Sequence, residues 1–307
     1  MHASKYSKLR QPIFIFLSLS IFTHLAFSQA YSADQSSSKL SVNYPVKLDF
    51  IWVPAGSFLL GDQSGKGQAD EKPVRNIRLD GFWIQTTEVT RASYEQFVKE
   101  TQYETGNSCW IHQDGWIEQT GLDWDNPGFP QGATHPVTCV SWYDAKAFIT
   151  WLNQQSSHRF RLPSESEWEY AVRAGSNSTY FFGNDPIELC EFANAADLSA
   201  LADYPDFSVN QCNDNYVRTS PVGIFKPNPL GLYDVYGNVW EWVEDCWTDN
   251  YRNHPDDGKA NKAGDCSKRG FRGGGYGDIP HFARSTLRNR GVAEHRKDDI
   301  GFRLVLE

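Results

Sequence analysis

Three segments of the chain combine a residue that caps helices with apolar residues at helical spacing. The caps are Thr90, Ser141 and Ser164, and Asp144 and Glu167 follow the two serines at the spacing of a capping box. We therefore expect three helices. Their apolar faces would carry Tyr94, Phe97 and Val98 in the first; Trp142, Ala145, Phe148, Ile149 and Leu152 in the second; and Trp168, Ala171 and Val172 in the third.

Outside these segments, short apolar pieces alternate with Gly, Pro, Asn and Asp. This pattern is typical of brief strands joined by long irregular connections, which predicts an α+β fold. A domain so poor in regular structure needs other sources of stability, and the 11 tryptophans, disulfides and bound cations are the candidates. We expect large aromatic side chains to fill the core, namely Trp52, Trp83, Trp142, Trp168 and Trp242.

The first residues have the pattern of a secretory signal. Basic residues precede a mostly apolar stretch from Ile13 to Phe27, and small residues follow at a spacing that permits cleavage. We predict a signal peptide over residues 1–30, a polar linker over 31–47 and one domain over 48–307. The protein would then be exported, periplasmic or secreted, and would keep no membrane span after cleavage.

The chain is acidic, with a formal net charge of −9, and loss of the basic signal segment would make it more so. An acidic surface repels a phosphate backbone, and no cluster of Lys and Arg compensates for it. We therefore do not expect nucleic-acid binding.

Six cysteines lie after the signal segment. An even number in an exported chain indicates disulfides, although the sequence leaves their pairing open. A metal site would require closely spaced cysteine pairs, and there are none. Pairing each cysteine with its nearest neighbour would close three loops, each stabilising by about 3 kcal/mol: Cys109–Cys139, Cys190–Cys212 and Cys246–Cys266.

Seven blocks rich in Trp and Gly follow one another along the chain. They are IWVPAGSFLLGD, WIQTTEVT, HPVTCVSWYDA, RLPSESEWEYAVRAG, GLYDVYGNVWEWVEDCW, RGFRGGGYGDIPHFARSTLRNR and IGFRLV. In this order they resemble the formylglycine-generating enzyme, or sulfatase-modifying factor, family, over roughly residues 48–307. The resemblance implies a C-type-lectin-like α+β domain with little regular secondary structure.

The resemblance also implies calcium sites. In the family the GLYDVYGNVWEW block binds calcium, which matches Asp234 and Glu241 by side chain and Gly237 and Val239 by carbonyl. Carboxylates mixed with carbonyls are the ligands that this hard cation prefers. The alternative is that these residues only form turns. A second family site matches Asn194, Ala195, Asp214 and Tyr216.

The family's copper site does not match. Active members hold copper with two cysteines, five residues apart, just after a GGS segment. This chain has Asp278 and Ala283 at those positions and Gly275 in place of the serine. Cu(I) requires soft thiolates, so we expect neither copper nor conversion of cysteine to formylglycine.

Other polar residues surround the position of the missing thiolates. Asp278, His281, Arg284 and Ser285 could line a pocket, together with Trp240, whose family counterpart lies beside the substrate groove. These residues either bind a different metal or form an ordinary polar lining.

Two functions remain open. The first is an atypical oxidoreductase that acts on a peptide-like substrate without the cysteine pair, as in periplasmic siderophore-maturation relatives. The second is a non-catalytic, lectin-like module that binds a peptide, a glycan or a partner protein, since a fold does not determine a function.

Overall fold

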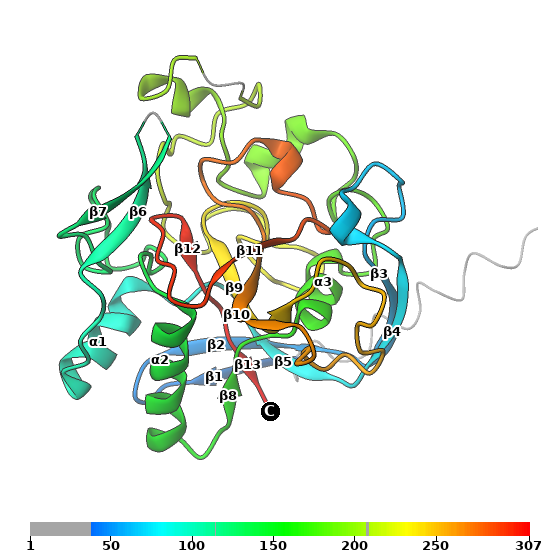
Figure 1. Ribbon diagram of the computed structural model, residues 1–307, viewed down its shortest axis with the longest axis horizontal. Coiled ribbons are helices and arrows are strands. Elements are labelled where there is room, and N and C mark those ends of the chain that lie inside the picture. The colour runs from blue at the N-terminus through cyan, green and yellow to red at the C-terminus, as the bar shows by residue number, and fades with distance from the viewer. Residues whose placement is uncertain (1–37, 114, 207–208) are drawn as a thin grey trace, which may run out of the picture. The chain divides into compact units, whose positions relative to one another are not determined.

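Two β-sheets form the framework of the domain (Figure 1). The computed structural model describes residues 38–113, 115–206 and 209–307. The predicted signal peptide lies outside the described residues.

The first sheet has five strands in the order β1-β2-β5-β13-β8, and all neighbours are antiparallel. β1 belongs to the segment that we expected to be a polar linker, so that prediction does not hold for these residues. Leu40 and Val42 point toward the core from alternate positions of β1, which explains its pairing with β2. The strands are β1 (Lys39–Val42), β2 (Leu48–Val53), β5 (Phe82–Gln85), β13 (Val305–Leu306) and β8 (Phe160–Arg161).

The second sheet has four strands in the order β11-β10-β9-β12. Two separate hairpins, β3–β4 and β6–β7, complete the strands. Their bounds are β9 (Trp240–Trp247), β10 (Asp265–Arg272), β11 (Asn289–Val292), β12 (Ile300–Gly301), β3 (Gly56–Leu60), β4 (Arg75–Leu79), β6 (Ser108–His112) and β7 (Trp116–Thr120).

The three predicted helices are confirmed, each with its predicted cap. The Thr90 hydroxyl accepts the N–H of Ser93 at the start of α1, and the two serines form capping boxes with Asp144 and Glu167. The helices are α1 (Arg91–Thr101), α2 (Trp142–Gln155) and α3 (Glu165–Arg173). The structure also has short 3-10 turns, namely η2 (Ala69–Glu71), η3 (Pro186–Glu191), η4 (Leu198–Ala202) and η5 (Pro280–Phe282).

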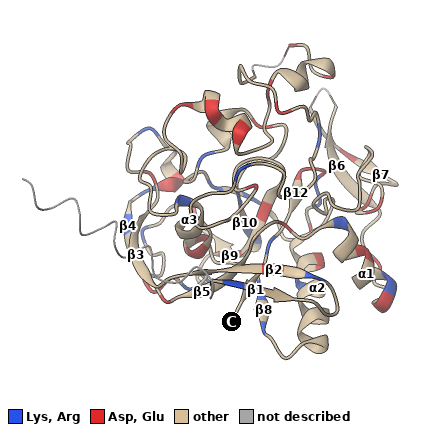
Figure 2. Ribbon diagram, turned by 180° about the vertical axis from the view of Figure 1, so that it is seen from behind, with Lys and Arg blue, Asp and Glu red and all other residues tan. Residues whose placement is uncertain are grey.

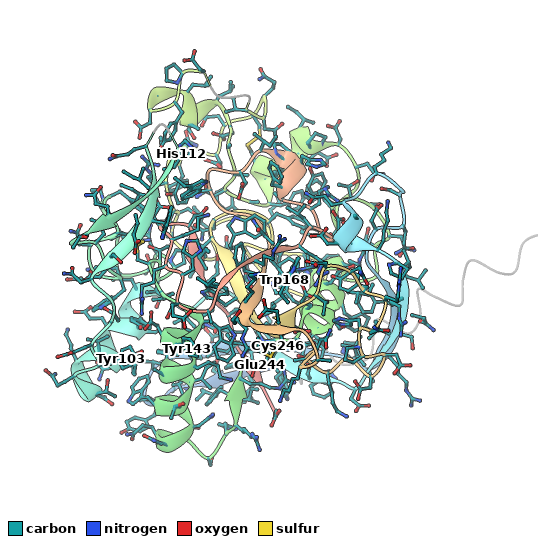
Figure 3. All side chains as sticks on the ribbon, viewed as in Figure 1. Tyr103, His112, Tyr143, Trp168, Glu244 and Cys246 are labelled. Carbon is teal, nitrogen blue, oxygen red and sulfur yellow. A yellow bond between two sulfur atoms is a disulfide. The ribbon has the colours of Figure 1, made fainter. Side chains whose placement is uncertain are left out.

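The core has two large parts, one around α1 and α2 and one around α3. Trp168 of α3 is fully buried in the second part, in the middle of the view in Figure 3. Trp142 and Trp242 are buried as predicted, and Trp83 is half-buried. The prediction is wrong for Trp52, which is 40% exposed and packs edge-on against Trp83 on the surface of the first sheet.

All three nearest-neighbour disulfides are present, so the predicted pairing is confirmed: Cys109–Cys139, Cys190–Cys212 and Cys246–Cys266. Acidic and basic residues are scattered along many elements (Figure 2). Within the described ranges, every helix is too short or too polar to cross a membrane.

Candidate calcium loops and a carboxylate site

The two predicted calcium loops contact each other directly. The N–H of Asn238 donates to the carbonyl of Asn194 over 2.7 Å. A Cβ on Gly237, whose φ is +76°, would lie 1.9 Å from that same carbonyl oxygen. The close approach therefore requires glycine at this position.

Residues of both loops carry buried oxygens that lack a donor. Oδ1 of Asp234 and Oδ1 of Asn194 have no hydrogen-bond partner in the described chain. The other oxygen of Asp234 accepts the N–H of Gly223 over 2.6 Å. Burial raises the pKa of Asp234 to about 6. A buried carboxylate oxygen without a donor fits a cation, so these residues suit the implied calcium.

Glu241 is already compensated by a cation of the protein itself. Arg303 donates to both of its carboxylate oxygens, each over 2.6 Å, and the indole N–H of Trp168 donates to one of them over 2.8 Å. A carboxylate has about four lone-pair positions. Glu241 therefore keeps room for about one further ligand contact.

Glu88 belongs to the same buried region, although no sequence pattern marks it. It is fully buried, one oxygen accepts the side-chain N–H of Asn238 over 3.1 Å, and the other has no partner among the described residues. Burial, and then the neighbouring Asp234, raise the pKa of Glu88 well above its usual range. The sequence shows Glu88 only as an acidic residue directly before the apolar Val89. Its partners Asn238 and Asp234 lie far away in the sequence, so no local pattern indicates a binding site.

The second loop is built around Asp214. Its two oxygens accept the N–H groups of Tyr216, over 2.7 Å, and Ala195, over 3.2 Å. Burial raises the pKa of Asp214 to about 7, and Asp197 adds to the shift. All four predicted residues of the second loop therefore lie together.

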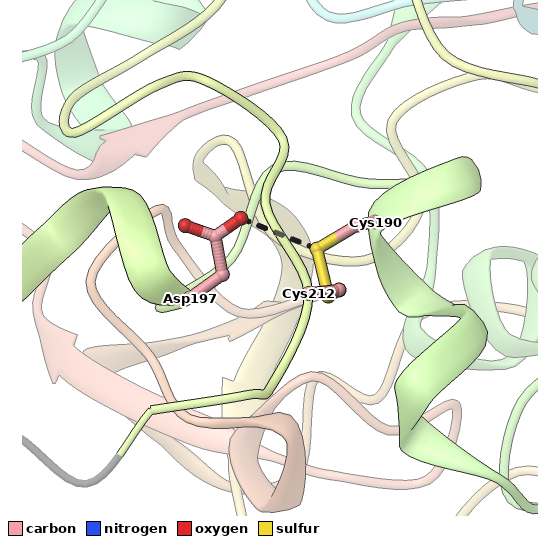
Figure 4. Close-up of side chains that lie close together, drawn as sticks. All are labelled: Cys190, Asp197 and Cys212. Atoms are coloured by element: carbon pink, nitrogen blue, oxygen red, sulfur yellow. Dashed lines mark hydrogen bonds between the residues drawn. A yellow bond between two sulfur atoms is a disulfide. The ribbon is translucent and has the colours of Figure 1, made fainter.

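Asp197 supports this loop beside a disulfide (Figure 4). Its Oδ2 lies 3.2 Å from Sγ of Cys190 and accepts the N–H of Asp214. Sulfur atoms in a disulfide carry no hydrogen and are not thiolates, so Asp197, Cys190 and Cys212 do not form a thiolate metal centre.

The two predicted calcium loops, around Asp234 to Glu241 and around Asn194 and Asp214, hold the segment that matches the family's copper loop; we call them the calcium loops for this prediction. The N–H of Gly237 donates to the carbonyl of Gly273 over 3.0 Å, and the N–H of Tyr276 donates to the carbonyl of Asn238 over 2.9 Å. From the second loop, the N–H of Ala196 donates to the carbonyl of Asp278 over 3.0 Å. The position of Asp278 therefore depends on both loops.

Asp278 and Trp240 come together, as the sequence predicted. The N–H of Gly275 donates to Oδ2 of Asp278 over 2.8 Å. A Cβ on Gly275 would lie 3.0 Å from Cβ of Asp299 and 3.2 Å from Cδ1 of Trp240. Asp278, Asp299 and Trp240 therefore all lie next to Gly275. Burial, and then Asp299, raise the pKa of half-buried Asp278 to about 6, while the indole N–H of Trp240 favours its ionised form.

Acidic side chains outnumber basic ones in the surroundings of Gly275. Nζ of Lys297 lies 3.0 Å from Oδ1 of Asp299. The adjacent Asp298 accepts the hydroxyl of Tyr276 over 2.8 Å with one oxygen, and its other oxygen has no partner in the described part of the chain. Burial raises the pKa of Asp298 to about 7. We call Trp240, Asp278, Lys297, Asp298 and Asp299 the carboxylate site.

The other three predicted pocket residues lie elsewhere. His281 is exposed on η5. Arg284 forms a two-pronged ion pair with buried Glu71, with distances of 2.8 and 3.0 Å, because that carboxylate needs a positive partner. Ser285 is buried against the hydroxyl of Tyr236, 2.7 Å away.

Copper does not fit this site. Ala283 is buried next to Gly274, and all six cysteines of the sequence form disulfides. The chain therefore offers no thiolate for Cu(I).

A second buried acidic cluster joins Glu165, Asp245 and His254. Arg288 pairs with Glu165 through two hydrogen bonds, of 2.8 and 3.0 Å. Both oxygens of Asp245 accept backbone N–H groups. Burial lowers the pKa of His254 to about 4, so its ring is neutral at neutral pH. The arginine charge and these donors explain the cluster without a metal ion.

Comparison with known proteins agrees with this architecture. The family model described as the sulfatase-modifying factor enzyme 1-like domain matches residues 39–307. The chain belongs to this family. The formylglycine-generating enzyme of Mus musculus is 31% identical, over 92% of this chain and 82% of that protein. The inactive Cα-formylglycine-generating enzyme 2 of Bos taurus is 28% identical, over 83% and 87%.

A solved structure supports the fold. PvdO from Pseudomonas aeruginosa superposes with a TM-score of 0.72 at 33% sequence identity, covering 84% of this chain and 94% of that one. The expected α+β, formylglycine-generating-enzyme-like fold is therefore confirmed. The family includes both active and inactive members, so membership alone does not establish a reaction.

Proposed function

We propose that this family member is exported and acts as an atypical oxidoreductase on a peptide-like substrate that presents a cationic group to the carboxylate site. The observation that carries the proposal is the pairing of Asp278 with Asp299 beside Trp240. An ammonium or guanidinium group placed there would relieve the repulsion between the acids. The indole N–H of Trp240 favours the ionised form of Asp278 and so keeps the carboxylate available to such a cation.

Asp278 is also suited to proton transfer. A carboxyl group with a pKa of about 6 is mostly ionised at pH 7 and can accept a proton from a bound substrate. The substrate would lose two electrons and two protons to an acceptor from outside the chain. Dioxygen, which would be reduced to hydrogen peroxide, is the first acceptor to test. Three disulfides support export, since they persist in oxidising compartments. Structural calcium at the two loops completes the proposal.

The second candidate is a non-catalytic binding module, which would use the same site for a peptide, glycan or partner protein. The inactive bovine relative favours it.

The test separates binding from chemistry. Mature protein in calcium is titrated with lysine amide and with hexapeptide pools that carry lysine at one end and mixed residues elsewhere. We expect binding that weakens about tenfold in Asp278→Asn. Aerobic incubation followed by mass spectrometry would detect the loss of two hydrogen atoms, with matching oxygen uptake. Binding without a mass change would support the module, and binding that does not depend on Asp278 would contradict the proposed site.

A further inference from the structure

A cavity of about 670 Å³ opens between the β6–β7 hairpin and β11. Its walls include Ser108, Trp110 and Glu118 from the hairpin, and Arg290, Val292 and His295 from β11 and the residues after it. The volume lies in the range of small-ligand sites. We call it the β11 pocket.

The β11 pocket and the carboxylate site are joined by one short stretch of chain. Along it, His295 packs edge-on against Trp110, with ring centroids 5.4 Å apart, and Nζ of Lys297 lies 3.6 Å from the ring centre of Trp116. Asp299, two residues further, belongs to the carboxylate site. Four residues of chain span at most about 14 Å, so the two sites lie within reach of one extended ligand.

β11 offers one main-chain donor to such a ligand, because the carbonyl of Val292 already accepts the N–H of His295 and the N–H of Arg290 donates to Oδ1 of Asn289. It is the outermost strand of the second sheet, with β10 on one side only (Figure 1). The N–H of Ala293 donates to Ser267 across the β10 side. Because bonding alternates along an antiparallel ladder, the N–H of Val292 faces the outer edge. A carbonyl of an extended peptide can accept this edge N–H.

The charges of the pocket suit a peptide chain better than a polyanion. Glu118 accepts the hydroxyl of Ser108 over 2.7 Å, and Arg296 is paired with Asp144 over 2.8 Å. Lys268 and Arg290 then balance Glu118 and Glu294, which leaves two charges of each sign among the lining residues. The half-buried ring of Trp110 adds an apolar surface.

We propose that the β11 pocket is a second subsite, which binds the extended main chain of a peptide-like ligand whose cationic end occupies the carboxylate site. This inference rests on the proposed function for the identity of that end. The ligand class is therefore a peptide of about six residues, which spans roughly 20 Å when extended, rather than an isolated amino acid.

The experiment compares lysine amide with the hexapeptide pools that carry lysine at either end. In the wild-type protein one pool should bind at least tenfold more tightly than lysine amide. Val292→Trp should fill the pocket and remove this gain without changing the affinity for lysine amide. Ile224→Trp is the matched control, because Val292 and Ile224 are both 48% exposed and Ile224 does not line the pocket.

The outcomes separate the two proposals. If lysine amide binds through Asp278 but neither pool binds more tightly, the second subsite is overturned and the carboxylate site stands. If a pool binds independently of Asp278 and Val292→Trp abolishes that binding, the pocket stands and the proposed function fails. Equal weakening by Val292→Trp and Ile224→Trp would overturn the pocket.

Discussion

The calcium loops and the carboxylate site lie side by side, yet different groups compensate the buried negative charge in the two regions. Around the calcium loops, Glu241 has Arg303 as a partner, and the lone oxygens of Asp234 and Asn194 fit a cation. At the carboxylate site, Lys297 is the only cation among the described residues that pairs with Asp299. Raised pKa values occur in both regions, at Asp278 and Asp298 here and at Asp234 and Asp214 in the loops. We infer that the first region stabilises the fold, whereas the second keeps negative charge for the proposed cationic ligand.

The largest effect should come from breaking the charge balance of the calcium loops. Arg303→Met would leave Glu241 buried without its partner and should cost about 3–5 kcal/mol of the free energy of unfolding. Urea denaturation in calcium measures it. The matched control is Lys146→Met, whose pair with Glu244 is partly exposed and should contribute about 0–1 kcal/mol. Similar losses in the two variants would contradict this view of the calcium loops.

Calcium removal should have the next largest effect. A ligand that binds only the folded state at a hundredfold excess over its Kd stabilises by about 2.7 kcal/mol. Chelator should therefore lower the Tm of the wild-type protein, and it should lower the Tm of Asp234→Ala by less. Because both loops hold the segment from Gly273 to Asp278, chelator should also weaken lysine amide binding. Unfolding that is the same with chelator and with calcium, and no ion by elemental analysis, would show that the loops bind no calcium.

At the carboxylate site the stability effect should have the opposite sign. The pKa of Asp278 is raised to about 6 in the folded protein from 3.8, so the folded state holds its proton more strongly than the unfolded state. The contribution of Asp278 to stability is thus present below about pH 4 and is lost as the pH rises through 6. Asp278→Asn should raise the free energy of unfolding at pH 7.5 by about 1 kcal/mol, while it weakens ligand binding.

Thermal unfolding from pH 4 to 8, with Asp257→Asn as an exposed control, measures this difference. The gain of Asp278→Asn over the wild type should vanish toward pH 4. The affinity of the wild type for lysine amide should fall below pH 6, because the protonated carboxyl no longer attracts a cation. A variant that is less stable than the wild type at pH 7.5 would mean that Asp278 has a structural role.

Local signals in the sequence predicted the parts of the fold that depend on near neighbours. Thr90, Ser141 and Ser164 cap their helices because each bonds to an N–H three residues ahead. The sequence left the disulfide pairing open, and the nearest-neighbour option, with separations of 20 to 30 residues, is the one that the structure has.

The features that the sequence did not predict depend on contacts between residues that are far apart in the chain. Arg284 was placed in the pocket, but its partner Glu71 is 213 residues away and draws the guanidinium into the core. Glu88 meets Asn238 across 150 residues, and no local pattern marks that contact. The β11 pocket likewise depends on two hairpin strands meeting a distant edge strand. The directions of the Arg284 and Glu88 side chains depend on buried partners from distant segments. They can therefore be predicted only when the whole fold is known.

The smallest expected effect is the absence of one reaction. We expect no aldehyde when the wild-type protein is incubated with a sulfatase-motif peptide, copper and reductant, because Asp278 and Ala283 stand where the family holds copper thiolates. A carboxylate and a methyl group do not replace soft ligands for Cu(I). The double variant Asp278→Cys with Ala283→Cys tests whether only the ligands are missing, and Gly275 predicts that it stays weak without the serine hydroxyl. Copper-dependent formation of the aldehyde mass by the wild type would contradict the expectation and would require thiolate ligands released from one of the disulfides.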